Sequence, residues 1–487
     1  MEGVLRLEEA EEEQTIENKN VLARQLGLFA SIAITVGTVV GSGIFISPKG
    51  IVLQIDSVGL SLVIWVACGI VSVFGALSYC ELATSCPKSG GDFTYLLNTY
   101  GPLVAFLNVW TSLLATRTAS TAVLAITAAT YILRPFSSGC EELPALAVRL
   151  LAAALLFIIF YLNCVSVRWT SGAQKFFTSI KVLCLCVGIA VGIVLLCKGK
   201  YDNLKEPFRS VDVNVGGLSL AFYSGLYAYS GWQNLPQLTE EIVRPRRNIP
   251  LSITVSMVTI IIIYFCVNVA YFIVLTPSEI RASEAVALDF TAKINGNVSW
   301  IISICVAISC IGSINGSTLG TSRRYFVASR EGYLPSLFSM IQIRNKTPAP
   351  VGILMLLIST LTLCADNIYS IIYYLSFSRW LFLGLVVSTV PYLRIRCPEM
   401  ERPYKVPLFM PIIFTLFSVF VVSVALYTSP KNCGAGALIM LSGVPVYLIG
   451  VKSRSKPPLL TRAAENCTRF FQMLLLVVES DEPDKHI

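Results

Sequence analysis

The stretch ITVGTVVGSGIFISPKG, residues 34–50, lies inside an apolar run at 28–52 that is long enough to cross the hydrocarbon core of a membrane. It contains Gly41, Ser42 and Gly43 near its centre. Each glycine costs a helix interior about 1 kcal/mol relative to alanine, so this cluster predicts local unwinding at mid-depth. In hydrocarbon, an unwound backbone is tolerated only where it is buried in protein or lines a water-filled cavity.

A second stretch of the same kind is LAFYSGLYAYSGWQNLP, residues 220–236, with Ser224, Gly225, Ser230, Gly231 and Pro236. The two stretches lie five apolar runs apart, at the head of each half of a pattern typical of inverted-repeat transporters. Helix ends opened in this way offer free N–H groups to a carboxylate and free carbonyl groups to an ammonium. Close helix packing is the more common explanation of a single glycine-rich motif, but the pair favours a binding site for a zwitterion.

The rest of the chain follows the same apolar pattern. Of 487 residues, 55% are hydrophobic and only 14% are charged, and twelve apolar runs are present. The sequence therefore predicts an all-α membrane protein with twelve transmembrane helices. The runs lie at 28–52, 57–83, 101–132, 147–166, 174–197, 215–238, 251–276, 300–321, 349–365, 368–393, 409–428 and 435–451.

We expect five regions along the chain. They are a disordered cytosolic tail (1–25), a first five-helix repeat (26–199), a second five-helix repeat (200–395), helices 11 and 12 (396–455), and a cytosolic C-terminal tail (456–487) with an interfacial helix at 459–479. If the N-terminus lies inside, Lys and Arg are concentrated in the connections on the inner side of the membrane. This bias predicts that both termini are cytosolic.

Several function classes are disfavoured. The net charge of +8 comes from these connections, and no basic strip with interleaved aromatic residues indicates nucleic-acid binding. The fifteen cysteines form no CxxC pair and the one histidine is His486, so we expect no metal site and no cofactor. No reactive constellation indicates an enzyme.

Four ionisable residues lie inside the apolar runs, where such groups are costly and usually functional. Lys181 suits a structural cation beside the breaks, with a snorkelling side chain as the alternative. Arg117 suits gating or helix pairing, and Arg379 suits either the substrate cavity, where it would disfavour cations, or snorkelling. Glu81 suits a charge-paired anchor better than a proton relay.

Seven segments together resemble one family. They are VGSGIFISPKG (40–50), CELATSCPKSGGDFTYL (80–96), LAFYSGLYAYSGWQNL (220–235), TEEIVRPRRNIP (239–250), GSINGS (312–317), ASREGYLP (328–335) and ERPYKVP (401–407). The chain resembles the light chains of the heteromeric amino acid transporters, the L-type branch of the amino acid–polyamine–organocation superfamily, from about 22 to 479. Its likeness is greatest to the cystine and dibasic branch.

The resemblance implies the leucine-transporter fold with a 5+5 inverted repeat and sodium-independent exchange across the plasma membrane. It implies that Ser42 and Gly43 hold the substrate carboxylate and that carbonyls of Val39 and around Tyr227 and Ser230 receive the amine. Tyr227 would be the aromatic gate. Gly41, Ile44 and Gly231 complete the expected site, Lys181 matches the lysine of the fifth span, and Arg117 matches a basic position of the third.

The resemblance also implies a single-span heavy-chain glycoprotein, linked through a disulfide at Cys140 in the outer loop RPFSSGCEELP. By spacing alone, Cys433 is an equal candidate. This chain has Ser230 where the cystine and dibasic branch has an aspartate, so a cationic side chain loses its counter-charge. We therefore expect neutral substrates, large or aromatic, as for the aromatic-preferring member of the family. The alternatives are a broad exchanger that includes cystine and cationic amino acids, and an ion-coupled symporter.

Overall fold

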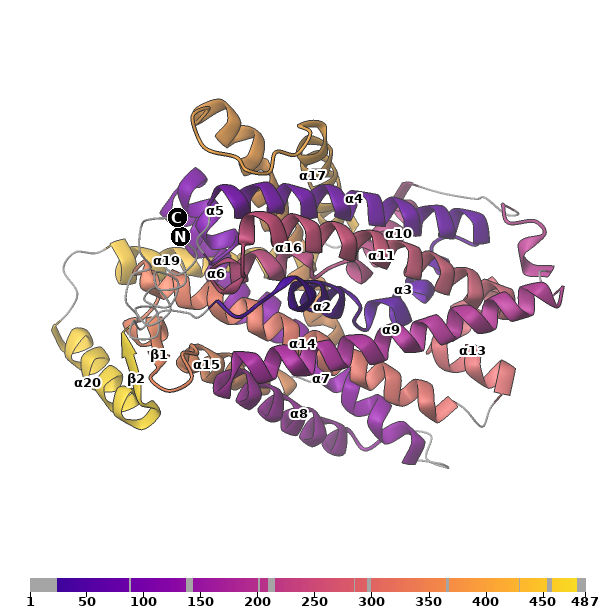
Figure 1. The fold of residues 1–487 in the computed structure, drawn as a ribbon, viewed down its shortest axis with the longest axis horizontal. Coiled ribbons are helices and arrows are strands. Elements are labelled where there is room, and N and C mark those ends of the chain that lie inside the picture. Colours follow the sequence, from indigo (N-terminus) through magenta and orange to yellow (C-terminus); the bar gives the residue numbers. More distant parts are fainter. Residues whose placement is uncertain are drawn as a thin grey trace, which may run out of the picture.

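The computed structural model describes residues 24–86, 89–136, 143–199, 202–208, 215–283, 285–295, 299–364, 368–428, 430–452 and 458–479. Long helices run side by side along the longest axis of the bundle (Figure 1). Nine helical segments in this part of the chain are long and apolar enough to cross a membrane, and α15 is apolar but shorter. A helix satisfies its own backbone groups, which is why apolar segments of this length form helices in lipid.

All twelve apolar runs expected from the sequence coincide with helices. In order they are α2 (Leu28–Val39) with α3 (Gly43–Val52); α4 (Val58–Ser85); α6 (Pro102–Thr111) with η1 (Ser112–Thr116) and α7 (Arg117–Leu133); α8 (Ala145–Val165); α9 (Val167–Cys197); α10 (Val215–Ala228) with η4 (Trp232–Glu241); α11 (Pro245–Val274); α14 (Ser299–Arg330); α15 (Ala349–Leu363); α16 (Ile368–Arg396); α17 (Phe409–Thr428); and α18 (Pro430–Leu441) with α19 (Gly443–Tyr447) and η7 (Leu448–Lys452). Shorter elements connect them: α5 (Asp92–Tyr100), η2 (Arg134–Phe136), η3 (Asp202–Leu204), α12 (Pro277–Ala282), α13 (Val286–Asn295) and η6 (Ser336–Ser339).

Both predicted interruptions are present. The first span stops at Val39 and resumes at Gly43. The sixth stops at Ala228 and resumes at Trp232, with Gly231 at a φ of +132° between them. The two breaks touch, because a Cβ built on Gly231 would lie 2.8 Å from the carbonyl oxygen of Thr38.

The second break is shorter than expected, since Gly225 lies inside α10. A Cβ at Gly225 would lie 2.7 Å from the Cys68 sulfur, and one at Gly37 would lie 2.0 Å from the Gln174 amide nitrogen. These two glycines therefore allow close helix packing.

The third span contains one turn of π-helix, η1, directly before Arg117. Such a turn inserts an extra residue and rotates the side chains that follow it, and it is common at functional sites. Here it lies where Thr116 and Arg117 face the interior of the bundle.

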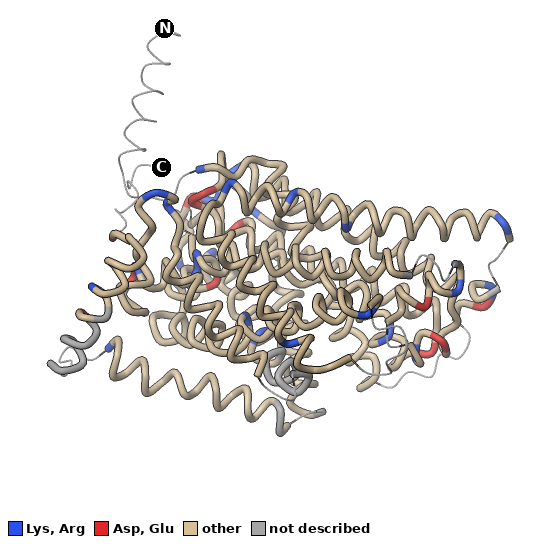
Figure 2. The backbone as a smooth tube through the Cα atoms, turned by 90° about the horizontal axis from the view of Figure 1, so that it is seen from below, with Lys and Arg blue, Asp and Glu red and all other residues tan. Residues whose placement is uncertain are grey.

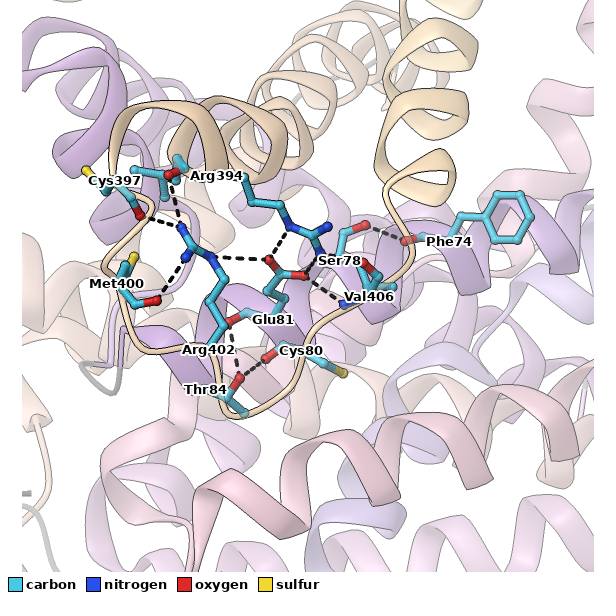
Figure 3. A network of polar contacts seen from close by, with 11 residues as sticks. Phe74, Ser78, Cys80, Glu81, Thr84, Arg394, Cys397, Met400, Arg402 and Val406 are labelled. Carbon is cyan, nitrogen blue, oxygen red and sulfur yellow. Dashed lines mark hydrogen bonds and ion pairs between the residues drawn. The ribbon is translucent and has the colours of Figure 1, made fainter.

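Acidic residues of the described chain lie toward the two ends of the bundle (Figure 2). One of these acidic residues, Glu81, lies in a network of hydrogen bonds and ion pairs (Figure 3). Its carboxylate accepts from Arg394 Nε at 2.9 Å and from the Val406 backbone N–H at 2.8 Å, and Arg402 Nε lies 3.8 Å away. These contacts join α4 to α16 and to the following loop, which confirms Glu81 as a charge-paired anchor.

The C-terminal segment differs from the expected single helix over 459–479. Helix α20 (Pro458–Leu475) ends earlier, and β2 (Val477–Glu479) pairs antiparallel with β1 (Met340–Gln342). The loop after α14 offers an open strand edge, and pairing satisfies backbone groups of both segments. Helix α20 and this small sheet lie at the same end of the bundle as α5 and α6 (Figure 1).

Candidate functional site

Lys181 lies directly behind the first break. It is near the middle of α9, which begins at Val167, and only 1% of its surface is exposed. Its ammonium donates to the carbonyl oxygens of Gly37 at 2.8 Å, Val40 at 2.7 Å and Ser309 at 3.1 Å. Burial of the whole side chain excludes the snorkelling alternative.

Two serines of α14 support the same carbonyls. Ser309 Oγ donates to Val40 O at 3.2 Å and to Gly41 O at 3.3 Å, and Ser313 Oγ donates to Gly37 O at 3.1 Å. The carbonyl groups that unwinding exposes thus accept hydrogen bonds from side chains of α9 and α14, and buried backbone groups need such partners.

The N–H groups on the other side of the break are available. No described residue accepts a hydrogen bond from the backbone N–H of Ser42, Gly43 or Ile44. These N–H groups lie at the start of α3, where the helix dipole favours negative charge. Gly43 permits the close approach of α10, since a Cβ there would lie 2.5 Å from the Ala228 Cα.

The expected amine acceptors are only partly available. The Val39 carbonyl already accepts from the Gly41 N–H at 2.9 Å, and it shares the Tyr264 hydroxyl, at 3.1 Å, with the Ala228 carbonyl, at 3.2 Å. A carbonyl oxygen has two lone pairs, so Val39 has little capacity left. The Tyr227 carbonyl accepts from the Ser230 hydroxyl at 2.7 Å, whereas no described residue donates to the Ser230 carbonyl.

A cavity lies against both breaks and holds about 620 Å³ of space, including solvent at its mouth. Of the residues expected in the site, it brings together Val39, Gly41, Ser42, Gly43, Arg117, Tyr227, Ser230, Gly231 and Arg379. Ile44 and Lys181 do not line it. Cys140 lies outside the described residues.

Several polar residues of the cavity were missed in the sequence. Thr116 and Ser120 on the third span, and Ser313 and Ser317 on α14, line it together with Asn234. Each hydroxyl pair is spaced by four residues, so that both members lie on one helix face. The four-residue spacing of hydroxyl residues, beside Arg117 and within GSINGS, is the sequence feature that could have indicated these cavity residues.

The cavity carries positive charge without a matching carboxylate. Arg117 and Arg379 line it, and among the described residues no Asp or Glu does. Neither guanidinium forms an ion pair with a described residue. The Asp92 carboxylate, in a neighbouring cavity, lies 2.7 Å from Arg324 Nη2 and accepts from the Tyr79 hydroxyl at 2.7 Å. An anion is therefore the complementary ligand for this site.

An all-helical bundle with two interrupted spans, free N–H groups and a polar cavity between them defines a multi-pass membrane transporter for small charged solutes. The chain belongs to the amino acid permease family, whose model matches residues 26–451. It is thus an amino acid transporter.

Its relatives cover nearly its whole length. It is 43% identical over 466 residues to the human cystine/glutamate transporter, covering 96% of this chain and 93% of that protein. It is 40% identical to the human large neutral amino acids transporter small subunit 2, covering 94% and 86% respectively. It is 38% identical to the human b(0,+)-type amino acid transporter 1, covering 97% of each. The resemblance to this group of transporters is confirmed.

Proposed function

We propose that this chain exchanges amino acids with an acidic side chain across the plasma membrane, without sodium, by alternating access. The observation that carries the proposal is the pair Arg117 and Arg379, which face the cavity without a carboxylate among its lining residues. A partly buried cation at membrane depth that lacks a partner is costly, so a ligand that supplies the counter-charge binds favourably there.

Each charged group of such a substrate has a complementary group in the cavity. The α-carboxylate accepts from the N–H groups of Ser42 and Gly43, and the ammonium donates to the carbonyl of Ser230. The side-chain carboxylate pairs with the two guanidiniums, which suit carboxylates in geometry as well as charge. The 43% identity to a protein named for cystine and glutamate supports this substrate class.

Large neutral amino acids, expected from the sequence, are the second candidate. Tyr227, Ser230 and Arg379 also border a separate aromatic cavity, together with Trp232 and Trp380, and this aromatic cavity holds about 430 Å³ of space including open solvent. Its aromatic walls suit an apolar side chain. The absence of a carboxylate at position 230 disfavours cationic substrates under both candidates.

Sodium independence follows from Lys181. Its ammonium donates to three carbonyl oxygens at the first break, the type of ligand that a sodium ion requires. A fixed positive charge there replaces a bound cation and repels another. Two five-helix repeats (26–199 and 200–395), with cytosolic termini, complete the proposed architecture.

The proposed partner is a single-span heavy-chain glycoprotein, joined through Cys140. One relative is named a small subunit, which supports a partner chain. The competing thiol, Cys433, is only 2% exposed in α18, so another chain has little access to its sulfur.

Exchange in proteoliposomes without sodium tests the proposal. Vesicles are loaded with unlabelled L-glutamate, L-phenylalanine, L-arginine or no amino acid, and uptake of each labelled amino acid is followed. We expect labelled glutamate to enter only vesicles loaded with a substrate. Exchange of phenylalanine without glutamate would favour the neutral candidate, and uptake into empty vesicles would contradict obligatory exchange.

A further inference from the structure

A second polar cavity adjoins the substrate cavity and holds about 350 Å³ of space, including open solvent. The two share Thr116, Arg117 and Arg379 as lining residues. The second cavity extends toward α5 and α6, at the end of the bundle that carries the Glu81 and Arg394 ion pair. By the proposed topology this is the cytosolic end, so the second cavity lies on the path between the substrate site and the cytosol.

The charge of this cavity is positive. Its titratable lining residues are Arg117, Arg324, Arg379 and Asp92. Asp92 is engaged by Arg324 Nη2 at 2.7 Å and by the Tyr79 hydroxyl at 2.7 Å. The charges of Arg324 and Asp92 largely cancel. The guanidiniums of Arg117 and Arg379, which form no ion pair with a described residue, therefore determine the electrostatic potential of the cavity.

Buried polar atoms without partners surround the cavity. No described residue makes a hydrogen bond with Thr111 Oγ1, Ser378 Oγ or Arg324 Nε. Thr111 and Ser378 are each 1% exposed and Arg324 is 2% exposed. Asn108 Oδ1 also has no partner among the described residues, and a half-turn of that amide presents its NH₂ group instead. Buried polar groups of this kind are normally satisfied, so several around one cavity are suited to a polar ligand.

We propose that this cavity is a second carboxylate-binding subsite, which holds the acidic side chain of a substrate on the cytosolic side of the main site. The hydroxyls of Thr111 and Ser378 and the Nε of Arg324 donate to the carboxylate. Arg379 and Arg117 border both cavities, so the carboxylate passes between them without losing its counter-charge. The subsite rests on the proposed function, because only an acidic substrate carries the second carboxylate.

Thr111→Val and Ser378→Ala test the subsite, because each removes a hydroxyl and nearly preserves the volume. The matched control is Ser359→Ala, since Ser359 is a buried hydroxyl without a partner in α15, outside both cavities. The KM for L-glutamate is measured separately on the internal and external faces of oriented proteoliposomes.

We expect each subsite variant to raise the internal KM about 10-fold, as for the loss of one hydrogen bond to a charged group. The external KM changes by less than about 3-fold, and Ser359→Ala changes neither value. Internal and external KM values that rise equally, or that do not rise, would overturn the subsite while leaving the proposed function intact. A lack of glutamate exchange by the unsubstituted protein would instead overturn the proposed substrate class and the subsite with it.

Discussion

The ammonium of Lys181 lies 2.7 Å from the carbonyl oxygen of Val40, a residue 141 positions earlier in the chain. This contact joins the middle of α9 to the first helix break and holds the unwound backbone in place. The contact thereby helps to position the N–H groups of Ser42 and Gly43.

Replacing Lys181 with methionine removes the donor to three buried carbonyl groups. Ser309 and Ser313 still donate to the Gly37 and Val40 carbonyls, so the loss is that of the charge-assisted hydrogen bonds, each worth about 1.5–3 kcal/mol. We therefore predict loss of exchange and a lower melting temperature of the purified protein. Lys175→Met on the same helix is the control, because Lys175 is exposed. Normal exchange by the Lys181 variant would contradict the structural role proposed for the Lys181 charge.

Gly231→Ala should disrupt the contact between the two breaks. The φ of +132° is unfavourable for alanine, and its Cβ would lie 2.8 Å from Thr38 O. We predict at least about a 10-fold loss of exchange rate, from a destabilisation of about 1–3 kcal/mol. Gly172→Ala in α9 meets no atom within 4 Å and should leave the rate unchanged. Equal rates for the two variants would show that the contact is unimportant.

Arg117→Gln and Arg379→Gln should each raise the KM for glutamate about 10- to 100-fold, because each removes a charge-assisted hydrogen bond. The KM for phenylalanine, where phenylalanine is exchanged, should change little. If both guanidiniums bind one carboxylate, the double variant loses less than the sum of the single losses. Equal effects on acidic and neutral substrates would instead place both arginines in a purely structural role.

Ser230→Asp introduces a carboxylate beside the cavity that holds Arg117 and Arg379. The added charge offsets one guanidinium and repels an acidic side chain, so glutamate exchange should fall at least about 10-fold. Uptake of arginine or lysine should appear in the same proteoliposome exchange assay. Ser230→Asn controls for size, and a similar profile for the two variants would exclude an effect of charge.

Cys140→Ser should abolish the covalent complex with the heavy chain, whereas Cys433→Ser should preserve it. The physical reason is access, since the Cys433 thiol is 2% exposed within α18. Non-reducing gels of cells that co-express both chains report the disulfide. A complex lost only with Cys433→Ser would reverse the assignment.

The sequence determined the membrane class, the twelve apolar helices and the two breaks. Apolar length and glycine clusters act locally, through the cost of exposing backbone groups to lipid, and local costs can be read along a chain. Where packing competes with unwinding, the prediction was less accurate: Gly225 stays inside α10 because Cys68 packs against it.

Tertiary structure alone decided how the charges are used. Arg117 and Arg379 lie far apart in sequence and face one cavity without a carboxylate among its lining residues, while Tyr264 and the Gly41 N–H occupy the Val39 carbonyl. Electrostatic interactions depend on distances between helices that are remote in sequence and on the burial between them. The residues that open the site can therefore be found from the sequence, but the sign of its charge requires the folded bundle.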